Sequence, residues 1–371
     1  MRLLIFIYSL GSGGAERVTT NLANYWAARG WEITIVTLAS TNADFYKLHP
    51  GIKRVAFDLT CDSGNLLSRL SNNIRRVKEL RRALREIQPD VALAMMSTAN
   101  VILALAARGL SNVCAIGSER TFPPQLPLGA IWEALRRNTY GQLAAVVALT
   151  QECAQWIGEH SSARRISVIP NPACWPLPEH GPQKKRSEIC SSERRLLLAI
   201  GRLSKEKNFE LLIDVFSRLA QEHVDWDLVI LGEGSERQGL EAQVKAGNLG
   251  KRVFLPGRIG NVGEWYEQAD LYVMTSRFEG FPNTLAEALS HGLAAVSFDC
   301  DTGPRDIIRH GIDGLLVPPG NSMELMSALG KMMSDSSLRE RFASKAVDAR
   351  ERFSIEKIAY MWEKLFTQCM Q

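Results

Sequence analysis

The chain has 371 residues, of which 46% are hydrophobic and 23% charged, and because single cores stop growing at roughly 250 to 300 residues, two domains are expected. The formal net charge of +4 is mild, so only a cluster of basic residues would indicate an anionic partner, and nucleic acid is not expected. The seven cysteines form no Cys-x-x-Cys pair and are spread along the chain, which favours reduced, buried thiols over a disulfide framework or a zinc site and predicts a cytoplasmic protein.

The first part of the chain, residues 1–170, alternates between strand and helix patterns. It opens with an apolar run over residues 3–10, a glycine loop, a helical pattern through Trp26 and a β-branched run over residues 33–38. Together these predict a β–loop–α–β unit. Further apolar runs alternate with helical segments, as in a parallel sheet covered on both faces, at residues 91–96, 113–117 and 144–149. We predict one doubly wound N-terminal domain.

A change of composition marks the middle of the chain. Residues 171–192 are rich in Pro, Lys, Arg, Glu and Ser and show no hydrophobic period, which predicts an exposed linker. The second domain is expected over residues 193–352. It repeats the alternating plan, with one helix at residues 209–221 and strands at residues 196–200, 228–231, 253–255, 271–274 and 295–298.

The two ends of the chain carry different apolar segments. The opening run is short for a signal sequence, ends in a glycine loop and lacks an Ala-x-Ala site, and no window reaches about 18 uninterrupted apolar residues. We therefore expect neither secretion nor a membrane span. Residues 355–370 have the pattern of an amphipathic helix, and we expect residues 353–371 to pack back on the N-terminal domain.

The first glycine loop places Gly13 and Gly14 at the start of a helix. Backbone N–H groups and the positive end of the helix dipole favour a phosphate there, and a plain tight turn is the alternative. A dinucleotide site would need a third glycine where Glu16 stands and an acidic residue after the second strand, where residues 38–42 have none. Hydride transfer is therefore disfavoured.

The second domain has two loops that carry charge. Arg202 and Lys207 follow its first strand and together match the charge of a diphosphate leaving group without a metal ion, unless the loop is only a solvated basic segment. We therefore expect no metal, and interpret the Asp-x-Asp strings at residues 225–227 and 299–301 as structural.

The stretch from residue 277 to residue 289 runs from a strand end into a helix and carries two carboxylates, Glu279 and Glu287. Asn283 or Thr284 is expected to cap this helix, whose N-terminus would face phosphate. Glu287, just over one turn into the helix, is expected to accept two ribose hydroxyls, although a glutamate there also suits simple capping.

Residues 66–87 contain a cluster of basic residues on a helical pattern. At roughly 100° per residue, five of them fall in one arc of about 120° and the apolar residues in another. The alternatives are the solvated exterior of a core-packed helix or a face that binds anionic headgroups and an acceptor pyrophosphate. The five residues of this basic face are Arg75, Lys78, Arg81, Arg82 and Arg85.

With these motifs in order, the sequence resembles the retaining glycosyltransferases of family 4, whose Glu-x7-Glu element is matched by Glu279 and Glu287. The resemblance also rests on Gly13-Gly14, Gly201-Arg202, Lys207, Gly232-Glu233-Gly234 and Gly257-Arg258. It implies an α/β GT-B fold with two Rossmann-like domains facing across a cleft.

The resemblance also assigns roles. It implies that Glu287 holds the ribose, that Glu279 contacts the donor sugar, and that backbone near Arg258 and Ile259 faces the base. It implies catalytic roles for Glu279, Arg202 and Lys207. The donor site that it implies comprises Gly13, Gly14, Arg202, Lys207, Glu233, Arg258, Ile259, Glu279, Gly280, Phe281, Asn283, Thr284 and Glu287.

Within that family, residues 12–17, 45–48 and 117–120 are similar to Pgl-type N-acetylgalactosaminyltransferases that extend lipid-linked oligosaccharides. The chain has Glu119-Arg120 where some of those enzymes have Glu-His. The resemblance implies α transfer of a hexose or N-acetylhexosamine, with N-acetylgalactosamine the best match, from a UDP-sugar to a polyprenyl-diphosphate-linked saccharide. It places the enzyme on the inner face of the membrane, with Glu119, Arg120 and the basic face toward acceptor and lipid.

Other functions fit the same architecture. A nucleotide-sugar epimerase would need its own acid and base around a sugar that is not transferred, and a phosphorylase would normally need a lysine-bound pyridoxal phosphate. A transferase with a soluble acceptor is a further alternative, and the basic face is explained chiefly by a charged acceptor. A binding module without catalysis would tolerate the loss of Glu279.

Overall fold

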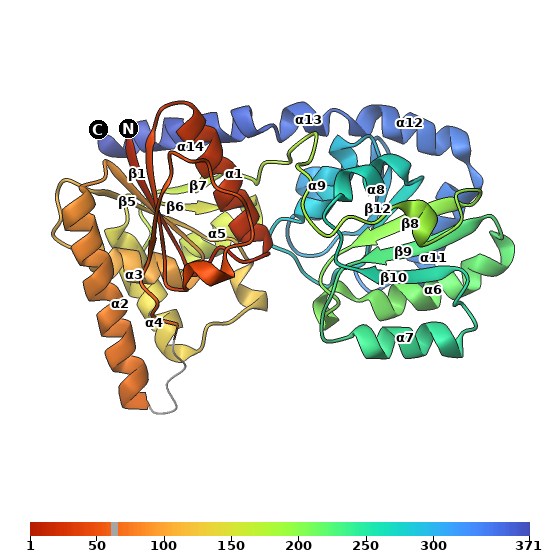
Figure 1. The fold of residues 1–371 in the computed structure, drawn as a ribbon, viewed down its shortest axis with the longest axis horizontal. Coiled ribbons are helices and arrows are strands. Elements are labelled where there is room, and N and C mark those ends of the chain that lie inside the picture. Colours follow the sequence, from red (N-terminus) through yellow and green to blue (C-terminus); the bar gives the residue numbers. More distant parts are fainter. Residues whose placement is uncertain (61–65) are drawn as a thin grey trace. The chain divides into compact units, whose positions relative to one another are not determined.

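The computed structural model describes residues 1–60 and 66–371, and it describes the backbone but not the side chains of residues 43 and 66–70. The chain forms two units (Figure 1). Unit 1 comprises Met1–Pro172 and Ile355–Gln371, and unit 2 comprises Ala173–Ser354. The last helix, α14 (Ile355–Met370), thus belongs to the same unit as the N-terminus.

Unit 1 is built on a seven-stranded sheet in which all neighbouring strands are parallel. Its strands are short and apolar because both faces are covered. The strand order is β3-β2-β1-β4-β5-β6-β7. The bounds are β1 (Arg2–Ile7), β2 (Glu32–Thr37), β3 (Lys53–Ala56), β4 (Val91–Met95), β5 (Cys114–Ser118), β6 (Ala145–Ala148) and β7 (Ile166–Val168).

Successive side chains of β1 point to opposite faces of this sheet. Leu3 and Ile5 enter a core that contains Trp26 and Trp362, whereas Leu4 and Phe6 enter a second core. Helices α1 and α14 cover the first face, and α2, α3 and α5 contribute to the second. The helices are α1 (Gly14–Ala28), α2 (Leu66–Ile87), α3 (Ser97–Ala107), α4 (Ala130–Thr139) and α5 (Gln151–His160), with short 3-10 turns η1 (Thr41–Ala43), η2 (Pro123–Gln125) and η3 (Tyr140–Gln142).

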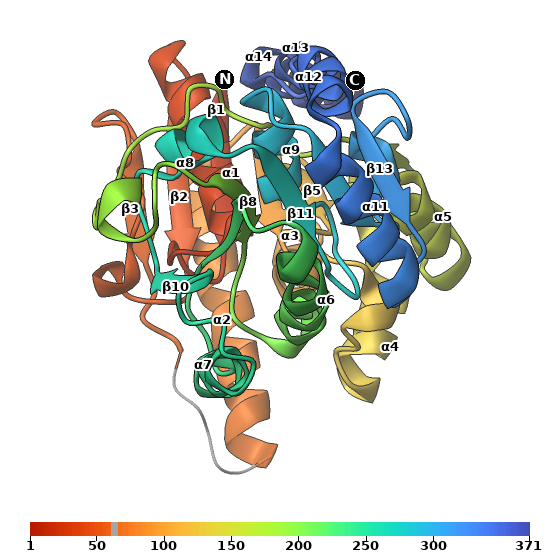
Figure 2. The same cartoon turned by 90° about the vertical axis from the view of Figure 1, so that its right-hand side faces the viewer.

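Unit 2 repeats the plan with six parallel strands in the order β10-β9-β8-β11-β12-β13. Helix α6 (Phe209–Glu222) packs between α7 (Arg237–Ala246) and α11 (Ser322–Ser334) on one face (Figure 2). The expected pair of Rossmann-like α/β domains is therefore confirmed. The strands are β8 (Arg195–Ile200), β9 (Trp226–Leu231), β10 (Val253–Gly257), β11 (Leu271–Met274), β12 (Ala295–Phe298) and β13 (Gly314–Val317).

The other helices of unit 2 are α8 (Val262–Gln268), α9 (Asn283–Ser290), α10 (Pro304–Ile307), α12 (Ser336–Ala346) and α13 (Ala349–Arg352), and its 3-10 turns are η4 (Arg186–Glu188) and η5 (Lys205–Lys207). The proline-rich segment after Pro172 also lies in unit 2. There the Lys184 ammonium donates to the carbonyl of Pro256 at 2.6 Å, and the Lys184 carbonyl accepts from the Trp265 indole at 3.0 Å. These bonds fix the segment against α8 and β10.

Candidate functional site

The predicted donor residues of unit 2 lie on loops at the carboxyl ends of its strands. Arg202 and Lys207 follow β8, Glu233 follows β9, and Glu279 follows β11. Because β8 lies between β9 and β11 in the sheet, the three loops share one edge. In open α/β sheets this edge is where ligands bind.

Lys207 and Glu279 are brought together although 72 residues separate them. The Lys207 Nζ lies 2.5 Å from Glu279 Oε1, and the Ser276 hydroxyl donates to the same oxygen at 2.6 Å. Thr302 Oγ1 donates to the Glu279 carbonyl. The two charged side chains are 21% and 12% exposed, so water reaches the pair only in part. Glu279 is thus held from both its side chain and its backbone.

Glu287 lies on α9 and is buried. The Tyr266 hydroxyl has one proton, which it shares between two acceptors, the Thr284 carbonyl at 3.0 Å and Glu287 Oε2 at 3.3 Å. A carboxylate held in this way has oxygen lone pairs to accept further hydroxyl groups. The predicted ribose acceptor therefore occupies a rigid position.

The capping prediction for α9 is wrong. The N-cap residue is Pro282, which has no side-chain group to cap with, and Asn283 is already the first helical residue. The Thr284 hydroxyl accepts from Tyr272 Oη at 2.8 Å. The physical reason is that the buried tyrosine supplies Thr284 with a partner, so its hydroxyl serves packing between β11 and α9.

Glycines bring the loops after β8 and β9 into contact. A Cβ on Gly232 would lie 1.8 Å from the Gly201 carbonyl oxygen, and a Cβ on Gly234 would lie 2.2 Å from the Leu203 carbonyl oxygen. Gly232 also has φ +147°, which side chains disfavour. Larger residues would push the two loops apart.

Glu233 and Arg258 lie near each other at this edge. Arg237 donates to both Glu233 oxygens at 2.7 Å, and this pairing, with the charge of Arg258, lowers the pKa of Glu233. Arg202 and Arg258 are exposed, and Ile259 is buried. Of the other predicted donor residues, Phe281 is buried against Phe353, and Gly280 and Asn283 are half-buried.

The remaining predicted donor residues, Gly13 and Gly14, belong to unit 1. Gly13 is the N-cap of α1, and the Glu16 carboxylate folds back over it, so that a Cβ on Gly13 would lie 2.1 Å from Glu16 Oε2. A negative group in the first turn is favoured by the helix dipole. Glu16 therefore occupies the region where we predicted a phosphate.

Glu119 and Arg120 lie directly after β5, and both are buried. Glu119 accepts from the Ser97 hydroxyl at 2.5 Å and from Tyr140 Oη. Burial raises the pKa of Glu119, and burial lowers the pKa of Arg120 to about 9. Ser97 and Tyr140 could not be predicted from the sequence, because neither stands in a recognisable spacing to Glu119.

The basic face of α2 is mostly exposed, at Arg75, Lys78, Arg82 and Arg85. Arg81 differs, because its guanidinium donates to the carbonyls of Ala106 and Arg108 at 2.7 Å each and so binds the end of α3. Arg82 pairs with Glu86 on the same helix at 2.8 Å. Arg69, also part of the basic cluster, has a side chain outside the described residues.

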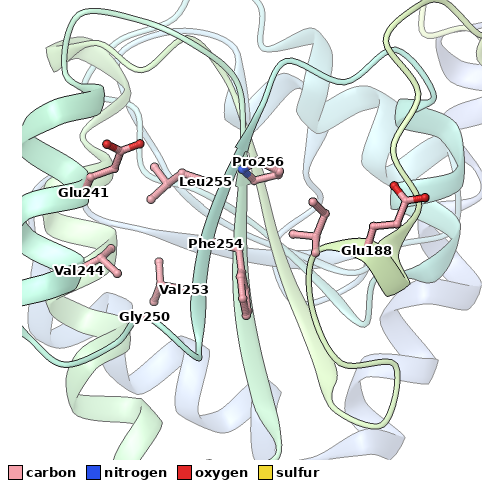
Figure 3. Close-up of a pocket in the computed structure, with 9 residues that line it drawn as sticks. Glu188, Glu241, Val244, Gly250, Val253, Phe254, Leu255 and Pro256 are labelled. Carbon is pink, nitrogen blue, oxygen red and sulfur yellow. The ribbon is translucent and has the colours of Figure 1, made fainter.

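A hollow elsewhere on unit 2 does not coincide with these loops. It lies along the edge strand β10 and the loop that joins α7 to β10, beside α7 and η4 (Figure 3). None of its lining residues is a predicted site residue. They are Glu188, Ile189, Glu241, Val244, Gly250, Val253, Phe254, Leu255 and Pro256.

Carboxylates of the Asp-x-Asp strings pair with arginine. Asp227 lies 3.1 Å from Arg194 and 3.2 Å from Arg252, and Asp299 lies 2.9 Å from Arg305. Over residues 1–60 and 66–371, no group of three or more His, Cys, Asp or Glu side chains is placed to hold a metal ion. Within the same described residues, no helix combines the length and apolarity needed to cross a bilayer.

Comparison with protein families assigns both parts of the chain. Residues 12–173 match the model described as Glycosyltransferase Family 4, and residues 182–348 match that described as Glycosyl transferases group 1. The two matches follow one another and correspond to units 1 and 2.

Two characterised relatives are informative. The chain is 28% identical over 369 residues to an α-1,4-N-acetyl-D-galactosaminyltransferase of Campylobacter jejuni that acts on a diphospho-undecaprenol-linked saccharide, covering 99% of each chain. It is 33% identical over 293 residues to an exopolysaccharide phosphotransferase of Streptomyces coelicolor. That match covers 78% of this chain, which spans only 30% of the relative's length.

Solved structures share the fold along the whole chain. A sucrose-phosphate synthase of Thermosynechococcus elongatus has a TM-score of 0.82 at 16% identity and covers 99% of both chains. An Anabaena protein solved in complex with UDP-glucose has a TM-score of 0.76 at 18% identity, covering 99% of this chain and 100% of its own.

Proposed function

This chain belongs to the glycosyltransferases that join a family 4 domain to a group 1 domain in the GT-B fold, and from that premise we propose a specific reaction. The enzyme transfers a hexose or N-acetylhexosamine, with N-acetylgalactosamine the first candidate, from a UDP-sugar to a polyprenyl-diphosphate-linked saccharide. The new bond retains the α configuration. Similarity to the Campylobacter N-acetylgalactosaminyltransferase along the full chain supports this acceptor class.

The main support for the proposed donor site is the arrangement of Lys207, Glu279 and Glu287 at the carboxyl ends of neighbouring strands. Lys207 and Glu279 form an ion pair. Glu287, on the helix α9 that follows the Glu279 loop, is held by Tyr266 of α8. In the proposed reaction Glu287 accepts the ribose hydroxyls. Lys207 and the exposed Arg202 bind the diphosphate and stabilise the charge that develops as it leaves.

The bond changes are simple in this reaction. An acceptor hydroxyl forms a bond to the anomeric carbon on the face from which the diphosphate departs, the bond from that carbon to the diphosphate oxygen breaks, and the hydroxyl proton passes to the departing diphosphate. The protein positions the reactants and stabilises charge. In the proposed reaction Glu279, which is fixed by Ser276 and Thr302, accepts hydrogen bonds from the donor sugar.

The acceptor is proposed to reach the enzyme at an anionic membrane surface. The exposed residues Arg75, Lys78, Arg82 and Arg85 on α2 support this, since each cation near acidic lipid contributes roughly 1 kcal/mol. This is the peripheral association that we propose for the cytoplasmic face of the membrane.

The test is a transfer assay with defined substrates. Purified protein is incubated with UDP-N-acetylgalactosamine, UDP-N-acetylglucosamine, UDP-galactose or UDP-glucose and with polyprenyl-diphosphate saccharides, in EDTA and in Mg²⁺. We expect one sugar to be transferred under both conditions and the product's anomeric proton to show α coupling by NMR. A β product, or UDP release without transfer for every acceptor, contradicts the proposal.

A further inference from the structure

Arg120 lies at the carboxyl ends of the unit 1 strands, and its buried guanidinium has no ionic partner among the described residues. Arg120 follows β5, and only 7% of the residue is exposed. Its Nη1 donates to Ser118 Oγ at 3.3 Å and its Nη2 to Asn171 Oδ1. Both partners are neutral, and the described part of the chain gives Arg120 no carboxylate.

The neighbouring carboxyl group of Glu119 is not the counter-ion of Arg120. Successive side chains after a strand point to opposite sides. Glu119 accordingly bonds to Ser97 and Tyr140, on the side of α3 and η3, whereas Arg120 bonds to Asn171, in the loop after β7. The two residues are adjacent in sequence and belong to separate hydrogen-bond networks.

A second observation concerns the Nε of Arg120, which is buried and has no hydrogen-bond partner in the structure. Arginine has five N–H donors, and among the described residues Arg120 forms two bonds. Burying a charge without a counter-ion is costly, so natural proteins rarely retain one unless it has a use. The planar group offers paired donors that match a phosphate.

The surroundings of Arg120 are rigid. Met96, at the end of the neighbouring strand β4, has φ 89° and ψ 150°, a conformation that is strained for any residue with a side chain. Its N–H donates to the Ser118 carbonyl at 2.9 Å, which ties this turn to the residue that bonds Arg120. Strain of this kind gathers at ligand sites, where fixed donors bind without reorganisation.

We propose that Arg120 binds a phosphate group of a substrate diphosphate. The inference rests on the proposed function, which supplies two diphosphates: that of the nucleotide donor and that of the lipid-linked acceptor. Both present the same chemistry to a guanidinium, so the experiment must separate them.

The experiment measures binding of UDP, farnesyl diphosphate and inorganic pyrophosphate by isothermal titration to wild-type protein and to Arg120→Gln. We expect the affinity for pyrophosphate and for one of the two organic diphosphates to fall about 10- to 100-fold, the usual worth of a charged hydrogen bond. The organic diphosphate whose affinity falls shows whether Arg120 binds the nucleotide donor or the lipid-linked acceptor. Arg120→Lys keeps the charge without the planar fork, and we expect an intermediate loss.

Arg137→Gln removes an exposed arginine of the same unit and is the matched control. Thermal unfolding without ligand serves as the second readout, because loss of an unpaired buried cation should leave the melting temperature unchanged or raised. If both Arg120 variants bind all three probes as wild type does, the inference is overturned while the proposed function stands. If wild-type protein binds neither UDP nor farnesyl diphosphate, both fail.

Discussion

Two buried or half-buried cations of this enzyme are held in opposite ways. Lys207 shares an ion pair with Glu279, whereas Arg120 rests on two neutral oxygens. A paired cation exchanges its carboxylate for a substrate phosphate at little cost, because the charge is matched before and after. The position of Glu279 then matters twice, as the resting partner of Lys207 and as an acceptor toward the donor sugar.

We expect Lys207→Ala and Glu279→Ala each to lower kcat/KM for transfer by about 100-fold or more. Lys207→Ala removes a donor at a developing negative charge, and Glu279→Ala removes the acceptor proposed to position the donor sugar. Both side chains are partly exposed, so the fold should survive, which circular dichroism checks. Arg218→Ala breaks an exposed pair with Asp214 in the same unit and is the control. Wild-type turnover in either variant would remove these residues from the site.

The buried carboxyl of Glu119 makes stability depend on pH. Burial raises its pKa in the folded protein, so the folded state binds the proton more tightly than the unfolded state. The stabilisation is fully present below the unfolded pKa of about 4.3 and is lost as pH rises through the folded value. We expect unfolding in urea to become easier for wild type than for Glu119→Gln as the pH is raised above the unfolded pKa of about 4.3.

The exposed Glu86, paired with Arg82, supplies the control for this titration. Glu86→Gln should follow the wild-type pH dependence. Parallel curves for wild type and Glu119→Gln would show that the carboxyl stays ionised in its bonds with Ser97 and Tyr140.

At the scale of elements, α2 performs two tasks. Its apolar side, with Leu80 and Leu84 fully buried, packs on the sheet and on α3. Arg81 satisfies two carbonyls at the end of α3, which would otherwise lack helical partners. The exposed cations are therefore the ones available to a membrane surface. Arg81 is better explained by its hydrogen bonds to the end of α3.

We expect the combined change Arg75→Glu, Lys78→Glu and Arg85→Glu to abolish sedimentation with phosphatidylglycerol vesicles, because three surface cations supply roughly 3 kcal/mol near acidic lipid. The affinity for UDP should be unchanged. Arg137→Glu with Arg164→Glu, both exposed in the same unit, is the control. Sedimentation equal to that of wild type would leave α2 as an ordinary solvated helix.

Most elements were predictable because their apolar runs are long and their periods clear. The runs at residues 3–10 and 196–200 became β1 and β8, and the helix expected at residues 209–221 is α6. The edge strands β3, β7 and β13 were missed. β3 carries Lys53 and Arg54 in four residues and β7 has only three residues, so neither shows a pattern that distinguishes it from a loop.

The candidate site was predictable as a set of residues and not as a set of bonds. Lys207 and Glu279 stand in separate motifs, and only the adjacency of β8 and β11 explains why they meet. The position of Glu16 over Gly13 depends on a side-chain rotamer, and Arg81 departs from the helical wheel because a long side chain reaches sideways to α3. Periodicity carries no information about such contacts.

The whole chain forms two units with separate cores, and one of them is closed by a distant segment. Trp362 on α14 is fully buried with Phe366, and Trp26 on α1 donates its indole N–H to Glu363 at 3.0 Å. The C-terminal helix therefore completes the core of unit 1 after the chain has traversed unit 2. Stability of unit 1 thus depends on residues that a split between residues 172 and 173 would remove.

We expect Trp362→Ala to destabilise unit 1 by about 3 to 5 kcal/mol, the usual cost of emptying a large buried aromatic site, and to leave unit 2 intact. Calorimetry should then show a transition of unit 1 that moves to lower temperature and a transition of unit 2 that does not. UDP should raise the melting temperature of the unit 2 transition only. Phe216→Ala, which empties a fully buried site in the core of unit 2, should reverse the pattern. One transition that shifts as a whole in both variants would mean that the two cores unfold as a single cooperative system, because loss of either core would then cost the other its stability.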